Sequence, residues 1–152
     1  MQQVQKIHYL KPESYSKPIN PNYVLTTSSL CFIFPSIICY LYNQYLMSTL
    51  CAMLMLTSIE HHGNPSLLSY ILDQIMIQLV VINVHYLAYQ LGFWTICRIL
   101  LLKSYCIFIY YGPYADRFVF HPNKIIGDLW HASMHIFLAF AICIAQPYLI
   151  LL

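Results

Sequence analysis

Charged side chains are scarce in this sequence. Only 8% of the 152 residues are Asp, Glu, Lys or Arg and 60% are hydrophobic, whereas soluble domains are about one quarter charged. No charged residue occurs from Pro18 to Ile59, a run about twice the ~20 residues that a transmembrane helix needs. The composition therefore predicts an integral membrane protein, and this run alone must contain two spans.

Other absences exclude further classes of protein. The net charge of +2 is too small and too scattered to indicate a nucleic-acid partner. A chain of 152 residues has no room for a separate soluble domain beside the membrane part. No CxxC pair is present, so we interpret the cysteines as small apolar side chains rather than as a disulfide or thiolate-metal framework. They are Cys31, Cys39, Cys51, Cys97, Cys106 and Cys143.

The apolar runs predict an all-α fold, a multi-pass transmembrane bundle of about five spans. Residues 1–21 form a polar tail with no secretory signal, and residues 22–152 form the transmembrane domain. Pro35 predicts a kink in the first span, and a loop from Gly112 to Gly127 leads into the last one. The expected spans are Tyr23–Tyr42, Tyr45–His62, Ser66–Leu87, Gly92–Tyr111 and a fifth that follows the loop and ends near Leu152.

The distribution of basic residues predicts the orientation. The tail carries three lysines, and Arg117 and Lys124 precede the last span, whereas the connections at the other face have almost none. Because basic loops stay inside, we expect a cytoplasmic amino terminus and an exterior carboxyl terminus. Five spans satisfy that arrangement.

Two imidazoles, His131 and His135, stand four residues apart in the last span, so both lie on one face of a helix. At about 1.5 Å per residue, Ser58, Asp73 and this pair all fall between ~6 and ~14 Å inside the cytoplasmic boundary, with His62 at its rim. This shared depth predicts one polar site. We favour His62 as its third imidazole, and His61, which is rotated by ~100° from it, remains the competitor.

Three neutral imidazoles without a thiolate are typical of a catalytic zinc ion, which keeps a fourth position open for water. Asp73 is then placed to orient that water and take its proton, and Ser58 to donate to the developing oxyanion. Alternatives stay open. The histidine pair alone also fits an interfacial feature without metal. His62 with His131 or His135 also fits the two axial ligands of a b-type haem, and Asp73 also fits an ion pair with Arg98 or Lys103.

The order Ser58-x-x-x-His62, Asp73, His131-x-x-x-His135 resembles the signature of the membrane hydrolase superfamily that includes the alkaline ceramidases and the adiponectin and progestin receptors. The eleven-residue step to Asp73 and its LLSYILDQI context are most similar to the alkaline ceramidases. In that family three histidines hold zinc, and the serine and aspartate contact the zinc-bound water. The resemblance therefore implies a zinc-dependent hydrolase with ligands His62, His131 and His135 and with Ser58 and Asp73 beside the water.

The chain departs from that family in length. The family has seven spans, so two helices between Asp73 and the histidine pair are missing here, and a second copy of the chain is one means of completing the lipid cavity. A membrane lipid is the expected substrate, and ceramide is implied by the resemblance alone. The alternative is a non-catalytic receptor- or fusion-type relative that keeps zinc as a structural clip.

Overall fold

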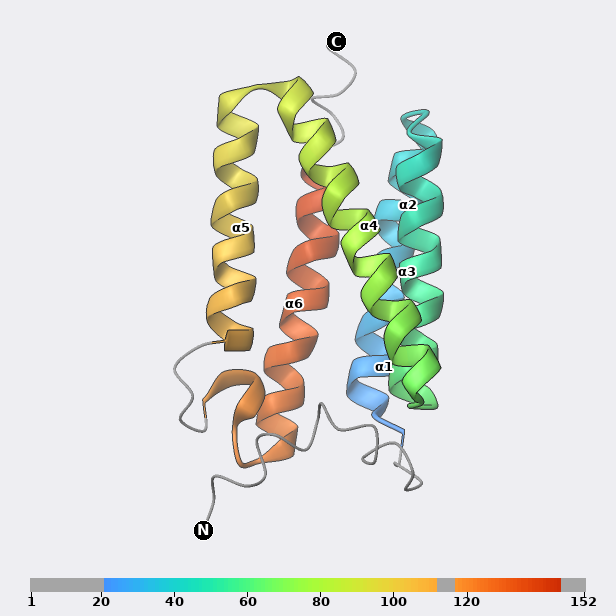
Figure 1. Ribbon diagram of the computed structural model, residues 1–152, viewed down its shortest axis with the longest axis vertical. Helices are drawn as coiled ribbons and strands as arrows, with labels where there is room; N and C mark the ends of the chain where they lie inside the picture. Colours follow the sequence, from blue (N-terminus) through green and yellow to red (C-terminus); the bar gives the residue numbers. More distant parts are fainter. Residues whose placement is uncertain (1–20, 112–116, 146–152) are drawn as a thin grey trace.

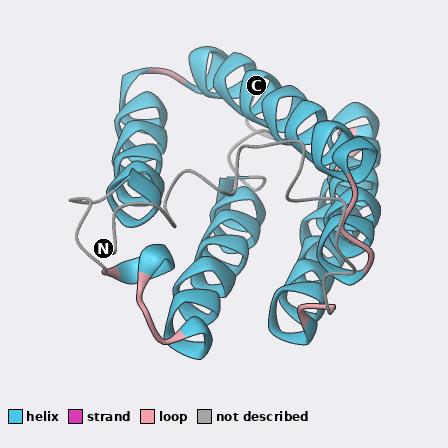
Figure 2. Ribbon diagram, turned by 60° about the horizontal axis from the view of Figure 1, so that its bottom comes forward, coloured by secondary structure: helices cyan, strands magenta, loops and turns pink. Residues whose placement is uncertain are grey.

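The computed structural model describes residues 21–111 and 117–145, and every regular element in these ranges is a helix (Figures 1 and 2). This confirms the all-α prediction for the described part of the chain. The predicted tail lies almost wholly outside the described residues. The elements are α1 Tyr23–Ser29, η3 Leu30–Phe32, α2 Ile33–Leu41, α3 Tyr45–Gly63, α4 Leu67–Leu91, α5 Phe93–Tyr111, η4 Phe118–Phe120 and α6 Lys124–Ala145.

Three described segments are long and apolar enough to cross a membrane: Tyr23–Leu41, Leu67–Gln90 and Lys124–Ile144. They indicate a membrane protein. α3 and α5 match the predicted second and fourth spans in their bounds but do not belong to this set. The sequence explains the difference for α3, because this helix has Glu-His-His in its last turn, whereas α5 includes residues whose side chains lie outside the described part of the chain. The count of five spans stays a prediction.

The first span is interrupted where the sequence predicts a kink. The short 3-10 helix Leu30–Phe32 separates α1 from α2 and ends three residues before Pro35. Proline has no N–H to donate to the carbonyl of Cys31, and its ring crowds that carbonyl. The backbone therefore tightens on the amino-terminal side of Pro35 while the chain continues in the same general direction.

Turn residues define the next two connections. Asn43 adopts a positive φ of 60°, which asparagine tolerates better than most residues, and the chain reverses there between α2 and α3. α4 begins with a capping box in which Ser66 accepts from the Ser69 N–H at 3.0 Å and the Ser66 N–H donates to Ser69 at 2.9 Å. These caps satisfy backbone groups that a membrane-embedded helix end cannot leave unpaired.

The predicted start of the last span is wrong by one helical turn. α6 begins at Lys124, so Gly127 lies inside the helix rather than at the end of the preceding loop. The Asn123 side chain accepts a hydrogen bond from the Ile125 N–H at 3.0 Å, and its carbonyl accepts from the Gly127 N–H at 3.1 Å. Asn123 is therefore an N-cap that the sequence argument missed. The predicted end near Leu152 lies outside the described residues.

α6 lies between the other helices of the bundle (Figure 1). It packs against α1, η3 and α2 on one side and against α5 and η4 on the other, while α4 crosses the molecule diagonally from α3 to α5 (Figure 1). The apolar core lies among α2, α3, α4 and the second half of α6. Its buried members are Phe32, Cys39, Met47, Cys51, Leu54, Val80, Ala139 and Ile142.

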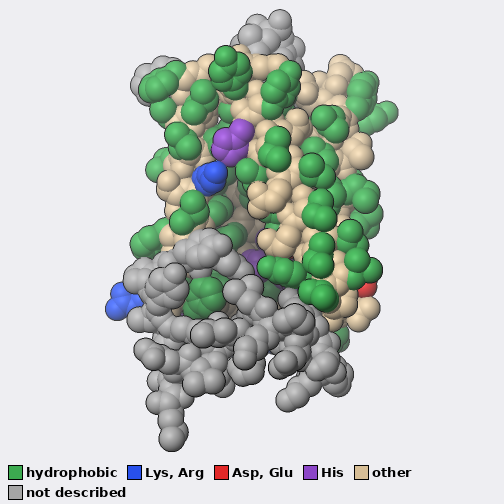
Figure 3. Space-filling view, in the orientation of Figure 1, with side chains coloured by type: hydrophobic (Ala, Val, Ile, Leu, Met, Phe, Trp, Pro, Cys, Tyr) green, Lys and Arg blue, Asp and Glu red, His purple; other side chains and the backbone are tan. Residues whose placement is uncertain are grey.

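Apolar side chains also cover much of the surface. Figure 3 shows hydrophobic groups over most of the described part of the visible face, with few charged ones. Large exposed apolar residues occur on each of the longer helices, for example Leu41, Leu68, Leu101 and Phe140. A soluble monomer rarely tolerates so much exposed apolar surface, so the outside of the bundle is suited to lipid.

Gly127 allows η4 to approach α6 closely. A Cβ atom at Gly127 would lie 2.8 Å from the backbone oxygen of Val119, whereas one at Gly63 would meet nothing nearer than Thr26 Oγ1 at 3.9 Å. The overpacking cost of about 1–3 kcal/mol exceeds the gain in helix propensity of up to about 1 kcal/mol. We therefore expect Gly127→Ala to lower the thermal unfolding midpoint in detergent, with Gly63→Ala as the neutral control. Equal midpoints for the two variants would contradict this account of the contact.

Candidate metal centre

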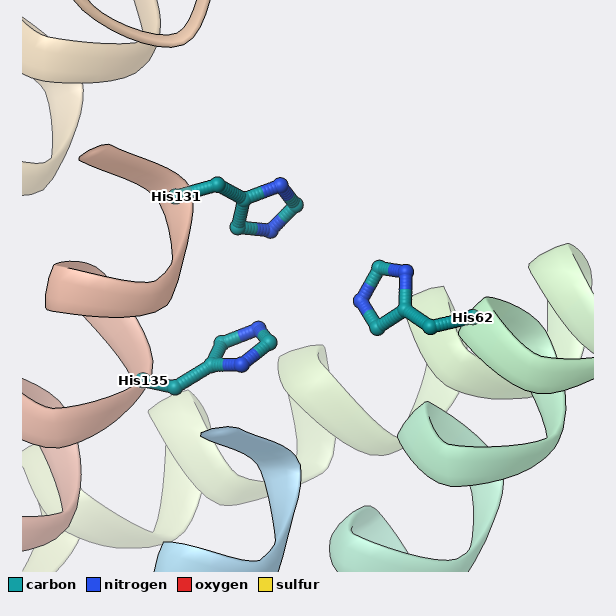
Figure 4. A group of neighbouring side chains, drawn as sticks. All are labelled: His62, His131 and His135. Carbon is teal, nitrogen blue, oxygen red and sulfur yellow. The ribbon is translucent and has the colours of Figure 1, made fainter. Parts of the chain in front are cut away.

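His62 from α3 and His131 and His135 from α6 converge on one point (Figure 4). One ligand nitrogen from each residue lies within 4.8 Å of those of the other two. The ring centroids are 5.3 Å apart for His62 and His131, 5.5 Å for His62 and His135, and 5.0 Å for His131 and His135. The grouping predicted from spacing and depth is therefore present, and these three imidazoles can hold a metal ion.

Helix ends bring the histidines together. His62 is the penultimate residue of α3 and is 7% exposed, and its carbonyl accepts a hydrogen bond of 2.8 Å from the Asn22 N–H at the start of α1. His131 and His135 lie in the second and third turns of α6. The end of α3 and the start of α6 meet beside α1, so all three rings lie toward the same end of the bundle.

His61 points elsewhere, as the rotation along α3 predicts. Its ring packs against Tyr70 of α4 at a centroid distance of 5.6 Å and against His62 at 4.9 Å. The group of potential ligands contains His62 and not His61. His61 Nδ1 is buried and has no hydrogen-bond partner among the described residues.

Ser28 of α1 contacts one of the three imidazoles directly. Its hydroxyl oxygen lies 2.8 Å from His135 Nδ1 and donates to the Leu25 carbonyl at 2.9 Å. Phe32 packs against the same ring, with 5.7 Å between centroids. With Nδ1 occupied by Ser28, Nε2 is the nitrogen of His135 that remains to bind a metal.

The donor set fits a transition metal of the zinc type. Tetrahedral zinc binds imidazole nitrogens at about 2.0–2.1 Å, which places the nitrogens about 3.4 Å apart. The three nitrogens lie within 4.8 Å of one another, so modest side-chain rotations bring them to that spacing. Imidazole nitrogen is a preferred ligand of zinc, copper, iron and nickel rather than of magnesium or calcium.

Ser58 and Asp73 lie in the same layer and are 3% and 4% exposed. Ser58 stands one helical turn before His62 on the same face of α3 and accepts a hydrogen bond of 3.0 Å from Ser29. Asp73 accepts from Thr57 at 3.5 Å and lies close to Ser58. Its described contacts are thus with hydroxyl groups of α3 and not with an imidazole.

The ion-pair alternative for Asp73 finds no support in the described side chains. Lys103 is exposed on α5 and makes no contact with this carboxylate among the described interactions. The side chain of Arg98 lies outside the described residues. A carboxylate that is buried against hydroxyl groups is more typical of a functional site than of a surface ion pair.

Sequence reasoning missed Ser28, Ser29 and Thr57, which hydrogen-bond to the predicted site residues. A signal was present, because Thr26 to Ser29 place four consecutive hydroxyl residues in a span that is otherwise mostly apolar. Hydroxyl side chains in a transmembrane helix either bond to their own backbone or face a polar partner on another helix. The sequence does not say which partner.

Comparison with known proteins finds no matching family model, no matching curated protein and no matching solved structure. The assignment of the site therefore rests on the geometry and on the chemistry of its side chains.

We expect the metal content to separate His62 from its neighbour. Purified wild-type protein should contain about one transition-metal ion per chain, His62→Ala should fall close to background, and His61→Ala should keep the metal, because only His62 completes the three-nitrogen group. Elemental analysis of detergent-purified protein measures this. Equal losses in the two variants, or a metal-free wild type, would show that the three rings do not act as a ligand set.

Proposed function

We propose that this protein is an integral membrane, zinc-dependent hydrolase that cleaves an amide or ester bond of a lipid. The observation that carries the proposal is a group of three imidazoles, one of which follows the buried Ser58 by one helical turn, while Ser58 in turn contacts the buried Asp73. Three protein ligands are typical of catalytic zinc, whereas structural zinc has four. A structural clip would also have no use for Ser58 and Asp73.

Zinc bound at this site would supply Lewis acidity, which polarises a carbonyl group and makes a coordinated water acidic near neutral pH. Asp73 would accept a proton from the water molecule that attacks the carbonyl carbon of the lipid. Ser58 donates a hydrogen bond to the carbonyl oxygen as negative charge develops there. The carbon–nitrogen or carbon–oxygen bond then breaks, and Asp73 returns the proton to the amine or alcohol that leaves.

Hydroxyl groups of α1 and α3 support these roles. The Ser29 hydroxyl lies 3.0 Å from the Ser58 hydroxyl, and Ser58 also hydrogen-bonds to the Asp73 carboxylate, so both partners hold Ser58 in place. The Thr57 hydroxyl lies 3.5 Å from Asp73 and restricts the direction of the carboxylate. Both contacts fix side chains that would otherwise sample several rotamers.

The bilayer determines the substrate class in this proposal. The site lies between helices whose outer faces are apolar, and the depth that we propose for it in the bilayer is one that acyl chains reach. A lipid amide is the leading candidate, and ceramide is chosen among lipid amides only because the residue pattern resembles that of the alkaline ceramidases.

A b-type haem is less compatible with this grouping. Two axial imidazoles bind iron from opposite faces of the porphyrin, and here a third ligand nitrogen lies within 4.8 Å of both candidate axial nitrogens. That third ring would occupy space that the porphyrin needs. The arrangement therefore favours a single ion over haem.

Asp73→Asn tests the chemistry. We expect this variant to retain zinc, because Asp73 is not a ligand, and to lose turnover by about 10²–10⁴-fold, the usual contribution of a general acid–base. Glu60→Gln is the matched control, since it also removes one carboxylate but lies exposed at the end of α3. The measurement is hydrolysis of a panel of ceramides, phospholipids and acyl amides by zinc-loaded protein. No hydrolysis by the wild type would leave the non-catalytic, structural zinc as the function.

We further propose five spans with a cytoplasmic amino terminus, in keeping with the lysines of the tail and with α1 beginning and α6 ending at opposite ends of the bundle (Figure 1). Tags on the two termini should then be accessible from opposite sides of the membrane. Protease protection of sealed vesicles measures this. Accessibility of both tags from one side would require an even number of spans.

A further inference from the structure

We propose that Ser28 is a positioning residue of the metal centre, which holds His135 as the tautomer with its hydrogen on Nδ1 and so leaves Nε2 free for the metal. The inference rests on the proposed metal site, which it deepens by assigning a role to the first span. The observation behind it is the contact of 2.8 Å between Ser28 Oγ and His135 Nδ1.

Hydrogen counting selects the direction of this bond. Ser28 has one hydroxyl hydrogen and two neighbours that can receive it, the Leu25 carbonyl at 2.9 Å and His135 Nδ1 at 2.8 Å. If the hydrogen goes to the carbonyl, the Nδ1–H donates to Ser28, and the hydroxyl makes two hydrogen bonds. If it goes to Nδ1, the bond to the carbonyl is lost and the hydroxyl makes one. Interiors poor in water favour the arrangement with more bonds.

The preferred arrangement is also the one that a metal requires. With the hydrogen on Nδ1, the lone pair of His135 is on Nε2, the nitrogen that Ser28 does not occupy. The other tautomer would place a hydrogen on Nε2, and such a ring cannot bind a metal through that atom. Histidine ligands in metal sites commonly donate their second N–H to a neighbouring oxygen for this reason.

The first span holds this serine in place by two further features. Phe32 is 2% exposed and packs on the His135 ring, so Ser28 and Phe32 approach the ring from positions one helical turn apart in α1 and η3. Asn22 at the start of α1 donates to the carbonyl of His62 at 2.8 Å. One helix therefore contacts a ligand of α6 through a side chain and a ligand of α3 through its backbone.

Two measurements on the full chain in lipid bilayers test this role. The first is the nitrogen NMR spectrum of metal-free protein labelled at histidine, with His135→Gln identifying the His135 signals. We expect a protonated Nδ1 and a bare Nε2 in the wild type, and a mixture of tautomers in Ser28→Ala. A wild-type His135 protonated on Nε2 would overturn the proposal without the use of a Ser28 variant.

The second measurement is zinc affinity, from competition with a chelator. We expect Ser28→Ala to bind zinc about 10–100-fold more weakly, the usual effect of removing a hydrogen-bond partner of a ligand. Ser28→Thr should restore affinity, since threonine in a helix can also donate to the carbonyl of the preceding turn. Ser104→Ala is the control, because Ser104 donates to the Leu100 carbonyl at 2.8 Å but lies exposed on α5.

The outcomes separate the two proposals. Zinc binding by the wild type and unchanged affinity in Ser28→Ala would overturn the positioning role and leave the metal centre standing. A wild type that binds no zinc would end the proposed function, and the tautomer of His135 would still decide whether Ser28 orients the ring. Weaker binding in Ser104→Ala equal to that in Ser28→Ala would assign the effect to general loosening of helices and would also overturn the role of Ser28.

Discussion

The need to pair every buried polar group within an apolar bundle determines how this molecule is built. Lipid offers no hydrogen bonds, so a hydroxyl, imidazole or carboxylate that leaves water must find its partner on a neighbouring helix. Several buried polar residues meet this requirement in one layer near the end of α3, where Ser29 bonds to Ser58 and Asp73 contacts Thr57. By contrast, Thr26 Oγ1 and His61 Nδ1 have no hydrogen-bond partner among the described residues. The three imidazoles join that layer, and a metal ion would satisfy the nitrogens that hydrogen bonds leave open.

Sequence reasoning reached the helices and the histidine group because both follow from simple periodicities. Apolar run lengths gave helix bounds that agree closely for α3 and α5, and the four-residue step from His131 to His135 needs only helical geometry. The choice of His62 over His61 also came from rotation along one helix. The prediction that α3 and α6 share a site came from the depth in the membrane that we expect for each polar residue. This depth follows from the position of the residue along its span, which can be read from the sequence.

The features that the sequence did not reveal depend on contacts between helices and on local helix caps. Ser28 bonds to a residue 107 positions away, and no periodicity within α1 identifies that partner. The early start of α6 depends on the Asn123 side chain folding back on Ile125, a local choice that the preceding polar residues obscure. The 3-10 helix before Pro35 was predicted only in part, since proline predicts a distortion of the helix but not the form of that distortion.

α3 shows how a functional site affects the element that carries it. Its polar end removes it from the set of helices that are apolar enough to cross a membrane by composition, yet it packs against α1, α2 and α4. Packing therefore compensates for the hydropathy that Ser58 and His62 remove. The first span has the opposite character, being strongly apolar by composition, and it supplies the hydroxyls of Ser28 and Ser29. The site thus combines side chains of α3, whose polar end depends on contacts with neighbouring helices, with hydroxyl groups of the apolar helix α1, which covers that end. Neither helix alone carries all the side chains of the site.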